Sequence, residues 1–359
     1  MLTTARFDRR RFVPSMCATR ASSLSDPILE ESGTPLLVLD RTSRFSLRSW
    51  RPLLDLLRRE RVDVLHAHKF GSNVWASIIG RLAGVPVVVA HEHTWSFEGN
   101  PKRRLLDRFV IGRLATVVLA VSSQDRDRMI SIERLPAEKV VHVPNGVAPL
   151  PTSPRNRVRE ELGLSQSAPV VVSVSVLRRQ KSLDVLVRAA QRVHAFVPDA
   201  RFVIVGDGPE RGALVGLVRE LALQDVVLFT GHRTDVGDLL AAADVVASSS
   251  AYEGSPLALM ESIGAGRPVV ATGVGGVPEI VRDGIEGILV TPGDPDVLAD
   301  AIVRLLGDPV LRERMGAAGR KRQREEFDID VMVQRLETLY ESLFARTERA
   351  RGERWAPPG

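Results

Sequence analysis

The chain has 359 residues, of which 44% are hydrophobic and 26% are charged, and its formal net charge is +5. One hydrophobic core usually stops growing at roughly 200 to 300 residues, so this length predicts two domains with a cleft between them. The apolar runs are far shorter than the roughly 18 residues of a membrane-spanning helix, and 44 acidic residues accompany 49 basic ones, which disfavours membrane spans and nucleic-acid binding.

The first part of the chain alternates between helical and strand periods from about residue 46. We expect helices over 46–57, 75–82 and 103–114, and strands over 62–66, 85–89, 116–121 and 139–143. Short β-branched runs separated by helices predict a parallel sheet that is covered on both faces. These elements define an expected first domain, residues 1–148.

This domain begins unusually. Only a short strand candidate, Phe12 to Cys17, precedes the strand expected at Pro35 to Leu39. A nucleotide-binding sheet normally opens with a strand, a glycine-rich turn and a helix. We therefore expect the first domain to lack its leading strand and helix, through either a start that lies upstream or a genuine loss.

A proline-rich stretch without periodicity, PNGVAPLPTSPR at 144–155, is typical of a linker. A second alternation follows, with strands expected over 170–174, 202–205, 226–229, 244–247 and 268–271, and helices over 183–196, 210–221, 236–242 and 256–265. We expect a second domain at 149–326. Residues 327–359 should form a C-terminal helix that packs back on the first domain, then a disordered tail. The fold class is therefore α/β, with two doubly wound Rossmann-like domains facing a cleft.

The most informative segment is AYEGSPLALMESIGAG, residues 251–266. Ser255 is expected to be the N-cap of a helix, with Pro256 at the first helical position. The unpaired N–H groups of Leu257 and Ala258 and the positive end of the helix dipole favour a phosphate at this helix start.

Two carboxylates bracket this phosphate site. Glu253 lies just before it, and Glu261 lies about a turn and a half into the helix, where it can accept hydrogen bonds from ribose hydroxyls. A nucleotide-sugar carries hydroxyl groups at both ends and charge in the middle, so it suits this arrangement. The alternative is that one glutamate is a solvated loop acid and the other a surface helix residue.

With these residues the sequence resembles glycosyltransferase family four, a retaining, nucleotide-sugar-dependent family with the two-domain GT-B fold. Glu253 and Glu261, with seven residues between them, are similar to the paired glutamates of that family. Further segments agree in order and spacing: VVHVPNGV (140–147), VSVLRRQKSLDVLVRAA (174–190), FVIVGDGPER (202–211), VLFTGHRTDV (227–236), ADVVASSS (243–250) and GRPVVATGVGGVPEIV (266–281). The likeness covers nearly all of residues 62–327.

The resemblance implies that Glu253 contacts the donor sugar and Glu261 the ribose. It also implies that Lys181, with Arg178 beside it, neutralises the diphosphate, where fixed positive charge stabilises the leaving group. Many relatives carry an arginine or a small polar residue in place of Val176, so the exact cationic partner is open, and an ordinary solvated basic loop is the alternative.

The resemblance implies further donor contacts from loops around the helix start: Gly206, Asp207, Gly208, Arg233, Gly254, Ser255, Pro256, Leu257, Ala258, Gly275 and Gly276. Tight turns explain the glycines equally well. Simple solvation is the alternative for Arg233.

Two His-x-His pairs end successive strands of the first domain: His66 with His68, and His91 with His93. No third ligand or cysteine set accompanies either pair in the sequence, so we expect no metal ion. The resemblance implies that a histidine at this place, His93 in preference to His91, lies near the transferred sugar. Structural histidines with satisfied hydrogen bonds are the alternative.

The segment PKRRLLDRFVIGRL at 101–114 mixes basic and apolar residues at helical spacing. Such a helix can rest on an anionic membrane or receive a lipid-linked acceptor. The alternative is a helix packed on its own sheet with solvated arginines.

We therefore expect a retaining glycosyltransferase that moves a sugar from a UDP- or GDP-sugar to a hydroxyl acceptor in glycolipid, polysaccharide or glycoconjugate synthesis, without a cofactor. His93, Glu253 and Lys181 are the expected catalytic residues. The single cysteine, Cys17, and the lack of an apolar N-terminal signal predict a cytoplasmic protein, with peripheral contact at the inner membrane face left open. A nucleotide-sugar epimerase of the same fold and a non-catalytic donor-binding remnant are the alternatives.

Overall fold

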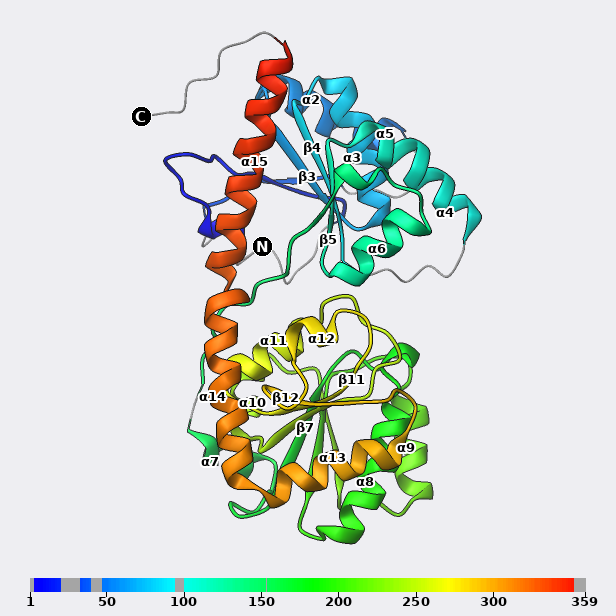
Figure 1. The fold of residues 1–359 in the computed structure, drawn as a ribbon, viewed down its shortest axis with the longest axis vertical. Coiled ribbons are helices and arrows are strands. Elements are labelled where there is room, and N and C mark those ends of the chain that lie inside the picture. The colour runs from blue at the N-terminus through cyan, green and yellow to red at the C-terminus, as the bar shows by residue number, and fades with distance from the viewer. Residues whose placement is uncertain (1–2, 21–32, 40–46, 94–99, 153, 352–359) are drawn as a thin grey trace. The chain divides into compact units, whose positions relative to one another are not determined.

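The computed structural model describes residues 3–20, 33–39, 47–93, 100–152 and 154–351 (Figure 1). The chain forms two compact units, one of Met1–Pro144 with Ile329–Gly359 and the other of Asn145–Asp328. The first boundary therefore lies within the proline-rich stretch, and the chain rejoins the first unit at Ile329. Among the described residues, no helix combines the length and the apolar character that a membrane crossing requires.

The described residues of the first unit form two parallel sheets. Strands β1 (Met16–Ala18) and β2 (Leu36–Val38) form one sheet, and β3 (Val64–His68), β4 (Val87–Glu92), β5 (Val117–Ala120) and β6 (Val140–His142) form the other in that order. The strand expected at Phe12 to Cys17 forms later, at β1. Residues 21–32 lie outside the described residues, so the expected loss of a leading strand and helix stays a prediction.

Helices cover the sheets of this unit: η1 (Thr4–Arg6), η2 (Leu47–Trp50), α2 (Arg51–Arg59), α3 (Phe70–Ala83), α4 (Pro101–Leu106), η3 (Asp107–Ile111), α5 (Gly112–Leu114), α6 (Ser123–Ser131), η4 (Ala137–Lys139) and α15 (Ile329–Arg351). The C-terminal helix α15 contacts β4. Helix α6 was not expected from the sequence because it buries only Asp125 and Met129 and so has no apolar stripe.

The second unit is built on one parallel sheet of six strands: β7 (Val170–Val174), β8 (Arg201–Val205), β9 (Val227–Gly231), β10 (Val245–Ser248), β11 (Val269–Thr272) and β12 (Gly287–Val290). Their order is β12-β11-β10-β7-β8-β9. The chain builds outward from β7 in one direction, then returns to β10 and builds in the other. The neighbours β7 and β10 therefore form the switch point of a doubly wound sheet, where ligands bind beyond the carboxyl ends of the strands.

The second unit holds the helices α7 (Arg155–Glu161), η5 (Arg179–Lys181), α8 (Leu183–Phe196), α9 (Arg211–Glu220), α10 (Val236–Ala242), α11 (Leu257–Gly264), α12 (Val277–Ile280), α13 (Pro295–Gly307) and α14 (Pro309–Glu326). Helix α7 begins where the sequence predicted only linker. It is anchored by Arg159, whose fully buried guanidinium donates to the carbonyl oxygens of Ala168 and Ala242 and pairs with Asp244. Because arginine is rarely buried, this anchor was not predictable from the sequence.

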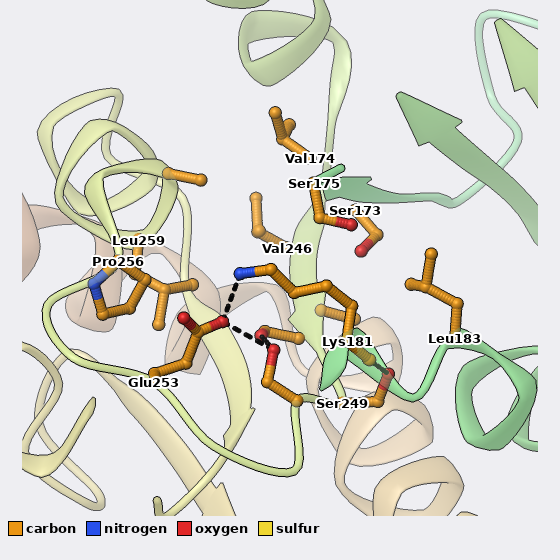
Figure 2. A pocket seen from close by; sticks show the side chains of 14 residues that line it. Ser173, Val174, Ser175, Lys181, Leu183, Val246, Ser249, Glu253, Pro256 and Leu259 are labelled. Atoms are coloured by element: carbon orange, nitrogen blue, oxygen red, sulfur yellow. Dashed lines mark hydrogen bonds and ion pairs between the residues drawn. The ribbon is translucent and has the colours of Figure 1, made fainter. Parts of the chain in front are cut away.

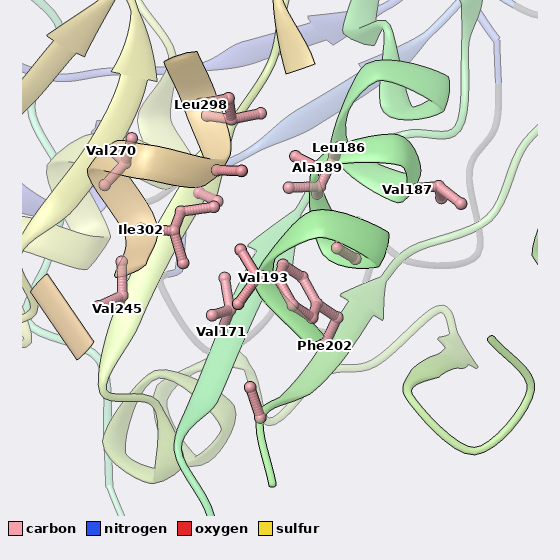
Figure 3. Close-up of a cluster of buried hydrophobic side chains, with 14 of the residues drawn as sticks. Val171, Leu186, Val187, Ala189, Val193, Phe202, Val245, Val270, Leu298 and Ile302 are labelled. Atoms are coloured by element: carbon pink, nitrogen blue, oxygen red, sulfur yellow. The ribbon is translucent and has the colours of Figure 1, made fainter. Parts of the chain in front are cut away.

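Two apolar clusters, one for each face of the sheet, hold the second unit together. The larger contains Phe202 of β8, Leu186 of α8 and Ile302 of α13, all at most 1% exposed (Figure 3). The other contains Val172 of β7 and Met260 of α11. Helices cover both faces of this sheet, so a ligand site cannot form on either face. The loops that follow the carboxyl ends of the strands are free to form one.

Candidate functional site

Lys181 and Glu253 meet beyond the switch point of the six-stranded sheet. Lys181 follows β7 and Glu253 follows β10, and Nζ of the lysine lies 2.5 Å from Oε1 of the glutamate (Figure 2). Ser250 donates a hydrogen bond to the same oxygen at 2.6 Å. The Glu253 side chain is only 7% exposed, so the ion pair is shielded from most of the solvent.

The two loops that carry this pair are tied together by their own hydrogen bonds. The hydroxyl of Ser249 donates to the carbonyl oxygens of Lys181 and Ser182 at 3.0 and 2.9 Å. The backbone N–H of Ala251 donates to the carbonyl oxygen of Gln180 at 2.8 Å. The position of the pair is therefore set by backbone contacts between loops about 70 residues apart in the chain.

A small pocket adjoins the ion pair, and serines form part of its wall. Ser173 and Ser175 line it from β7 and the loop that follows, and Glu253 and Pro256 line it from the loop after β10 (Figure 2). The hydroxyl of Ser175 is buried without a partner in the described part of the chain. The sequence reasoning missed these serines, although a run of polar residues at strand ends was visible.

The start of helix α11 differs from the expected cap. Pro256, and not Ser255, is the N-cap, with φ −70° and ψ 112° and no side-chain hydrogen bond. The backbone at Pro256 is still extended, so the helix begins one residue later than expected, at Leu257. The first intrahelical bond runs from Leu259 N–H to the Pro256 carbonyl oxygen, which leaves the N–H groups of Leu257 and Ala258 ahead of it.

Glu261 lies on the same helix but not on the wall of the pocket beside Lys181. Its carboxylate makes no hydrogen bond or ion pair with any described residue. Burial raises its pKa above the usual value. A partly buried carboxylate without a partner is free to accept hydrogen bonds from a ligand.

Glycines let two pairs of loops approach each other closely. A Cβ on Gly275, whose φ is +58°, would overlap the carbonyl oxygen of Glu253, and Gly276 N–H donates to the Gly254 carbonyl oxygen at 3.0 Å. A Cβ on Gly206, whose φ is +131°, would overlap the carbonyl oxygen of Ser175. The close approach of the backbones therefore requires glycine at Gly206 and Gly275, independently of any contact with a ligand.

The two arginines expected at the site differ in their surroundings. Arg178 is exposed, makes no side-chain hydrogen bond or ion pair with a described residue, and lines a surface groove together with Glu210 and Tyr252. Arg233 pairs with Glu161 and with Asp235, which hold the pKa of its guanidinium above the usual value. The alternative of simple solvation for Arg233 is wrong, because two carboxylates hold it.

In the first unit the two histidine pairs lie side by side. The register of β3 on β4 places His68 opposite His91. The ring centroids of neighbouring histidines are 4.3 to 5.2 Å apart across His66, His68, His91 and His93. Nitrogens of His66, His68 and His91 lie within 4.8 Å of one another. The expectation that no third ligand accompanies a histidine pair is therefore wrong, because the pairing of β3 with β4 brings a third histidine close. The expected lack of a metal ion stays a prediction.

Two further contacts fix this cluster. Asn73 of α3 clamps the backbone of His91, donating to its carbonyl oxygen at 3.1 Å and accepting from its N–H at 3.2 Å. His68 Nδ1 lies 2.8 Å from His93 Nε2. Burial lowers the pKa of His68 and of His93 to about 4, so both rings are neutral at pH 7.

The basic segment 101–114 is folded as α4, η3 and α5, and it presents two surfaces. Arg103 is buried, pairs with Glu92 at 3.0 Å and lies 3.5 Å from Asp107. Leu105 is 59% and Phe109 41% exposed. The segment therefore packs inward through its arginine and displays apolar side chains outward.

Comparison with known proteins places these features in a family. The alpha-D-kanosaminyltransferase of Streptomyces kanamyceticus is 33% identical over 72% of each chain. A GDP-mannose-dependent phosphatidylinositol monomannoside mannosyltransferase of Mycolicibacterium smegmatis is 36% identical over 70% of each chain. Profiles described as Glycosyltransferase Family 4 and Glycosyl transferases group 1 match residues 5–149 and 154–322. The chain belongs to glycosyltransferase family 4.

Solved structures of this glycosyltransferase's neighbours confirm the expected GT-B class of fold, with two Rossmann-like units. Anabaena HepE in complex with UDP and glucose superposes with a TM-score of 0.81 at 25% identity, covering 91% of each chain. The sucrose-phosphate synthase of Thermosynechococcus elongatus has a TM-score of 0.72 at 24% identity, covering 83% of this chain and 79% of its own. The expected family and fold are therefore both confirmed.

Proposed function

We propose that this glycosyltransferase takes a sugar from a UDP- or GDP-sugar and transfers it, with retention of configuration, to a hydroxyl acceptor in glycolipid, polysaccharide or glycoconjugate synthesis. The observation that carries the proposal is the Lys181–Glu253 pair at the switch point of the second unit. This pair supports the proposal because it lies where doubly wound sheets bind ligands. Lys181 would be the cation for the leaving group, and Glu253 would be the acceptor for sugar hydroxyls.

The positive groups suit a nucleoside diphosphate as leaving group. Lys181 and Arg178 lie on the same loop, and the N–H groups of Leu257 and Ala258 open a helix. Fixed donors aimed at developing negative charge are usually the largest single catalytic term, and each is worth about 10²- to 10³-fold in rate. Lys181 would turn from Glu253 to the diphosphate when the donor binds.

The carboxylates suit the two ends of the donor. Glu253, freed from Lys181, would accept hydrogen bonds from the transferred sugar, and the unpaired Glu261 would accept them from the ribose. His93, with His91 and His68 beside it, would orient the sugar or the acceptor from the first unit. Two relatives are named for UDP-Gal and GDP-mannose as donors, and HepE was solved with UDP and glucose, which supports a donor of this class.

We propose that transfer needs no metal ion, since Lys181 and Arg178 supply the charge that a metal would supply. Full activity after dialysis against EDTA is the expected result. Restoration of a lost rate by Mg²⁺ or Mn²⁺ would contradict this part of the proposal.

The acceptor is proposed to be linked to a lipid at the inner face of the membrane. Leu105 and Phe109 are exposed between Arg104, Arg108 and Arg113, a surface that suits an anionic bilayer. An Escherichia coli relative, 29% identical, acts on a sugar diphosphoundecaprenol, and the Mycolicibacterium smegmatis relative acts on a phosphatidylinositol mannoside.

Product analysis tests the central proposal. The chain is incubated with each nucleotide-sugar and a panel of hydroxyl acceptors, and the anomeric proton of the product is followed by NMR. We expect an acceptor-dependent glycoside with the anomeric configuration of the donor, and a rate about 10²- to 10³-fold lower in Lys181→Ala. A product with inverted anomeric configuration would exclude a retaining mechanism. Conversion of the nucleotide-sugar without an acceptor would favour an epimerase.

A further inference from the structure

A chain of hydrogen bonds runs from helix α15 to the end of strand β4. The hydroxyl of Tyr340 contacts Nδ1 of His66, and Nε2 of His66 lies 3.1 Å from Nδ1 of His91. All three side chains belong to the first unit. Tyr340 is 6% and His91 3% exposed, so water competes little for these hydrogen bonds.

The phenol determines the direction in which the protons are donated. Burial raises the pKa of Tyr340, so the hydroxyl keeps its proton. Its hydrogen-bond partner among the described residues is His66. If the hydroxyl accepted a hydrogen bond from His66, its own O–H would be buried without a partner, which is unfavourable. Tyr340 therefore donates to Nδ1 of His66.

Each ring then determines the tautomer of the next. Burial lowers the pKa of His66 and of His91, so both are neutral at pH 7 and each carries one proton. His66 accepts on Nδ1, carries its proton on Nε2 and donates to Nδ1 of His91. His91 is left with its proton on Nε2, a buried nitrogen without a partner in the part of the chain that the structure describes.

We propose that Tyr340 is a positioning residue that holds His66 and His91 in their Nε2–H tautomers, so that His91 presents one N–H donor near the carboxyl end of β4. The clamp of Asn73 on the His91 backbone keeps this donor in place. Its ligand is an oxygen acceptor, such as a hydroxyl or carbonyl oxygen. A role for the His91 N–H in glycosyl transfer rests on the proposed function. The assignment of the two tautomers does not depend on that function.

The same contacts argue against a metal ion at His66, His68 and His91. Both nitrogens of His66 already have partners, Tyr340 and His91, and Nδ1 of His68 is bonded to His93. A metal ion would have to displace at least one of these hydrogen bonds, and binding to Nε2 of His91 would also remove the proton on that nitrogen. Binding of Zn²⁺ therefore distinguishes a metal site from the hydrogen-bonded arrangement of Tyr340, His66 and His91.

The test is a long-range ¹H–¹⁵N NMR spectrum of the full chain labelled on histidine, with resonances assigned by their loss in His66→Gln and His91→Gln. In the wild type we expect the Nε2–H pattern for both rings. Tyr340→Phe removes only the hydroxyl and keeps the ring, whose centroid lies 6.0 Å from that of Phe7. In this variant the Nδ1 and Nε2 resonances of His91 should move toward each other, because two tautomers are then averaged.

The chain offers a matched control, since its other tyrosine is Tyr252 in the second unit. Tyr252→Phe should leave the His66 and His91 resonances unchanged. A bare Nε2 on His91 in the wild type would overturn the proposal, even if Tyr340→Phe failed to fold. So would an unchanged His91 spectrum in a folded Tyr340→Phe chain, or uptake of one Zn²⁺ per chain that His91→Gln abolishes.

Discussion

The ammonium group of Lys181 lies 2.5 Å from the carboxylate of Glu253, although the two residues are 72 positions apart in the chain. Each occupies the position of a group proposed to contact the donor, and in this structure each neutralises the other. A bound diphosphate would draw Lys181 away and release Glu253 for the sugar. Under the proposed function the pair would link charge neutralisation at the phosphate to recognition of the sugar.

The first prediction concerns the stability of this pair. Lys181→Met leaves the Glu253 carboxylate, 7% exposed, with the hydrogen bond from Ser250, so we expect a loss of about 3 kcal/mol in the free energy of unfolding. Glu253→Gln added to it should restore part of that loss, because no unpaired charge remains. Urea unfolding of the two single variants and the double variant measures this. Additive single effects would mean that the residues are not coupled.

Donor affinity should depend on Glu261. Loss of hydrogen bonds to a charged group is worth about 1.5–3 kcal/mol, so Glu261→Ala should weaken binding of the preferred nucleotide-sugar by about 10- to 100-fold. A thermal-shift panel of UDP-, GDP- and ADP-sugars measures the change. Glu220→Ala, an exposed acid of α9, is the control and should keep the wild-type shift. Equal stabilisation of Glu261→Ala and the wild type would remove this residue from the site.

Gly275 should not tolerate a side chain. In Gly275→Ala the new Cβ overlaps the carbonyl oxygen of Glu253, and the backbone φ of +58° is strained, so we expect a loss of about 3 kcal/mol or more. Gly284 has a φ of +75° but nothing within 4 Å of the new Cβ. Gly284→Ala should therefore lose only about 1–2 kcal/mol. Equal melting temperatures for the two variants would contradict the proposed contact.

The stability of the first unit should fall as pH rises toward 8. Burial raises the pKa of Asp107 from 3.8 to about 8, against the opposing charge of Arg103, so the folded state binds more protons than the unfolded state between these values. The contribution of Asp107 to the free energy of unfolding is therefore present at low pH. As pH rises between these two pKa values, it falls by up to about 1.4 kcal/mol per pH unit. Glu92, whose pKa is raised to about 7, adds in the same direction.

Asp107→Asn cannot titrate, so its free energy of unfolding should fall less between pH 5 and pH 8 than that of the wild type. Urea unfolding at each pH gives the slope. Asp127→Asn changes an exposed aspartate of α6 and should keep the wild-type slope. Identical slopes for Asp107→Asn and the wild type would show that Asp107 is ionised in both states.

Membrane contact should depend on Phe109. Its 41% exposed ring lies under the guanidinium groups of Arg108 and Arg113, so Phe109→Ala should weaken binding to phosphatidylglycerol vesicles by about 10-fold. Phe196 on α8 is 65% exposed and also lies under an arginine, Arg192, so Phe196→Ala is the matched control. Equal sedimentation of both variants with the vesicles would exclude this surface.

The strands of the second unit were predictable because they are short β-branched runs buried on both faces. The strand expected over 170–174 is β7 itself, and those expected over 244–247 and 268–271 are displaced by one residue. Helix α7 and strand β12 were missed. The first depends on the buried Arg159, and the second, Gly287–Val290, is four residues long and has no distinctive period.

The sequence alone determined the family, the alternation of strands and helices, the loops that carry Lys181 and Glu253, and the helix that carries Glu261. These follow from local periodicity and motif order. Only the tertiary structure decided which of these side chains meet. It paired Lys181 with Glu253, placed the two His-x-His pairs side by side and brought the hydroxyl of Tyr340 into contact with His66. The physical reason is that contacts between distant residues depend on strand order and helix packing, and local hydrophobic periodicity does not encode these.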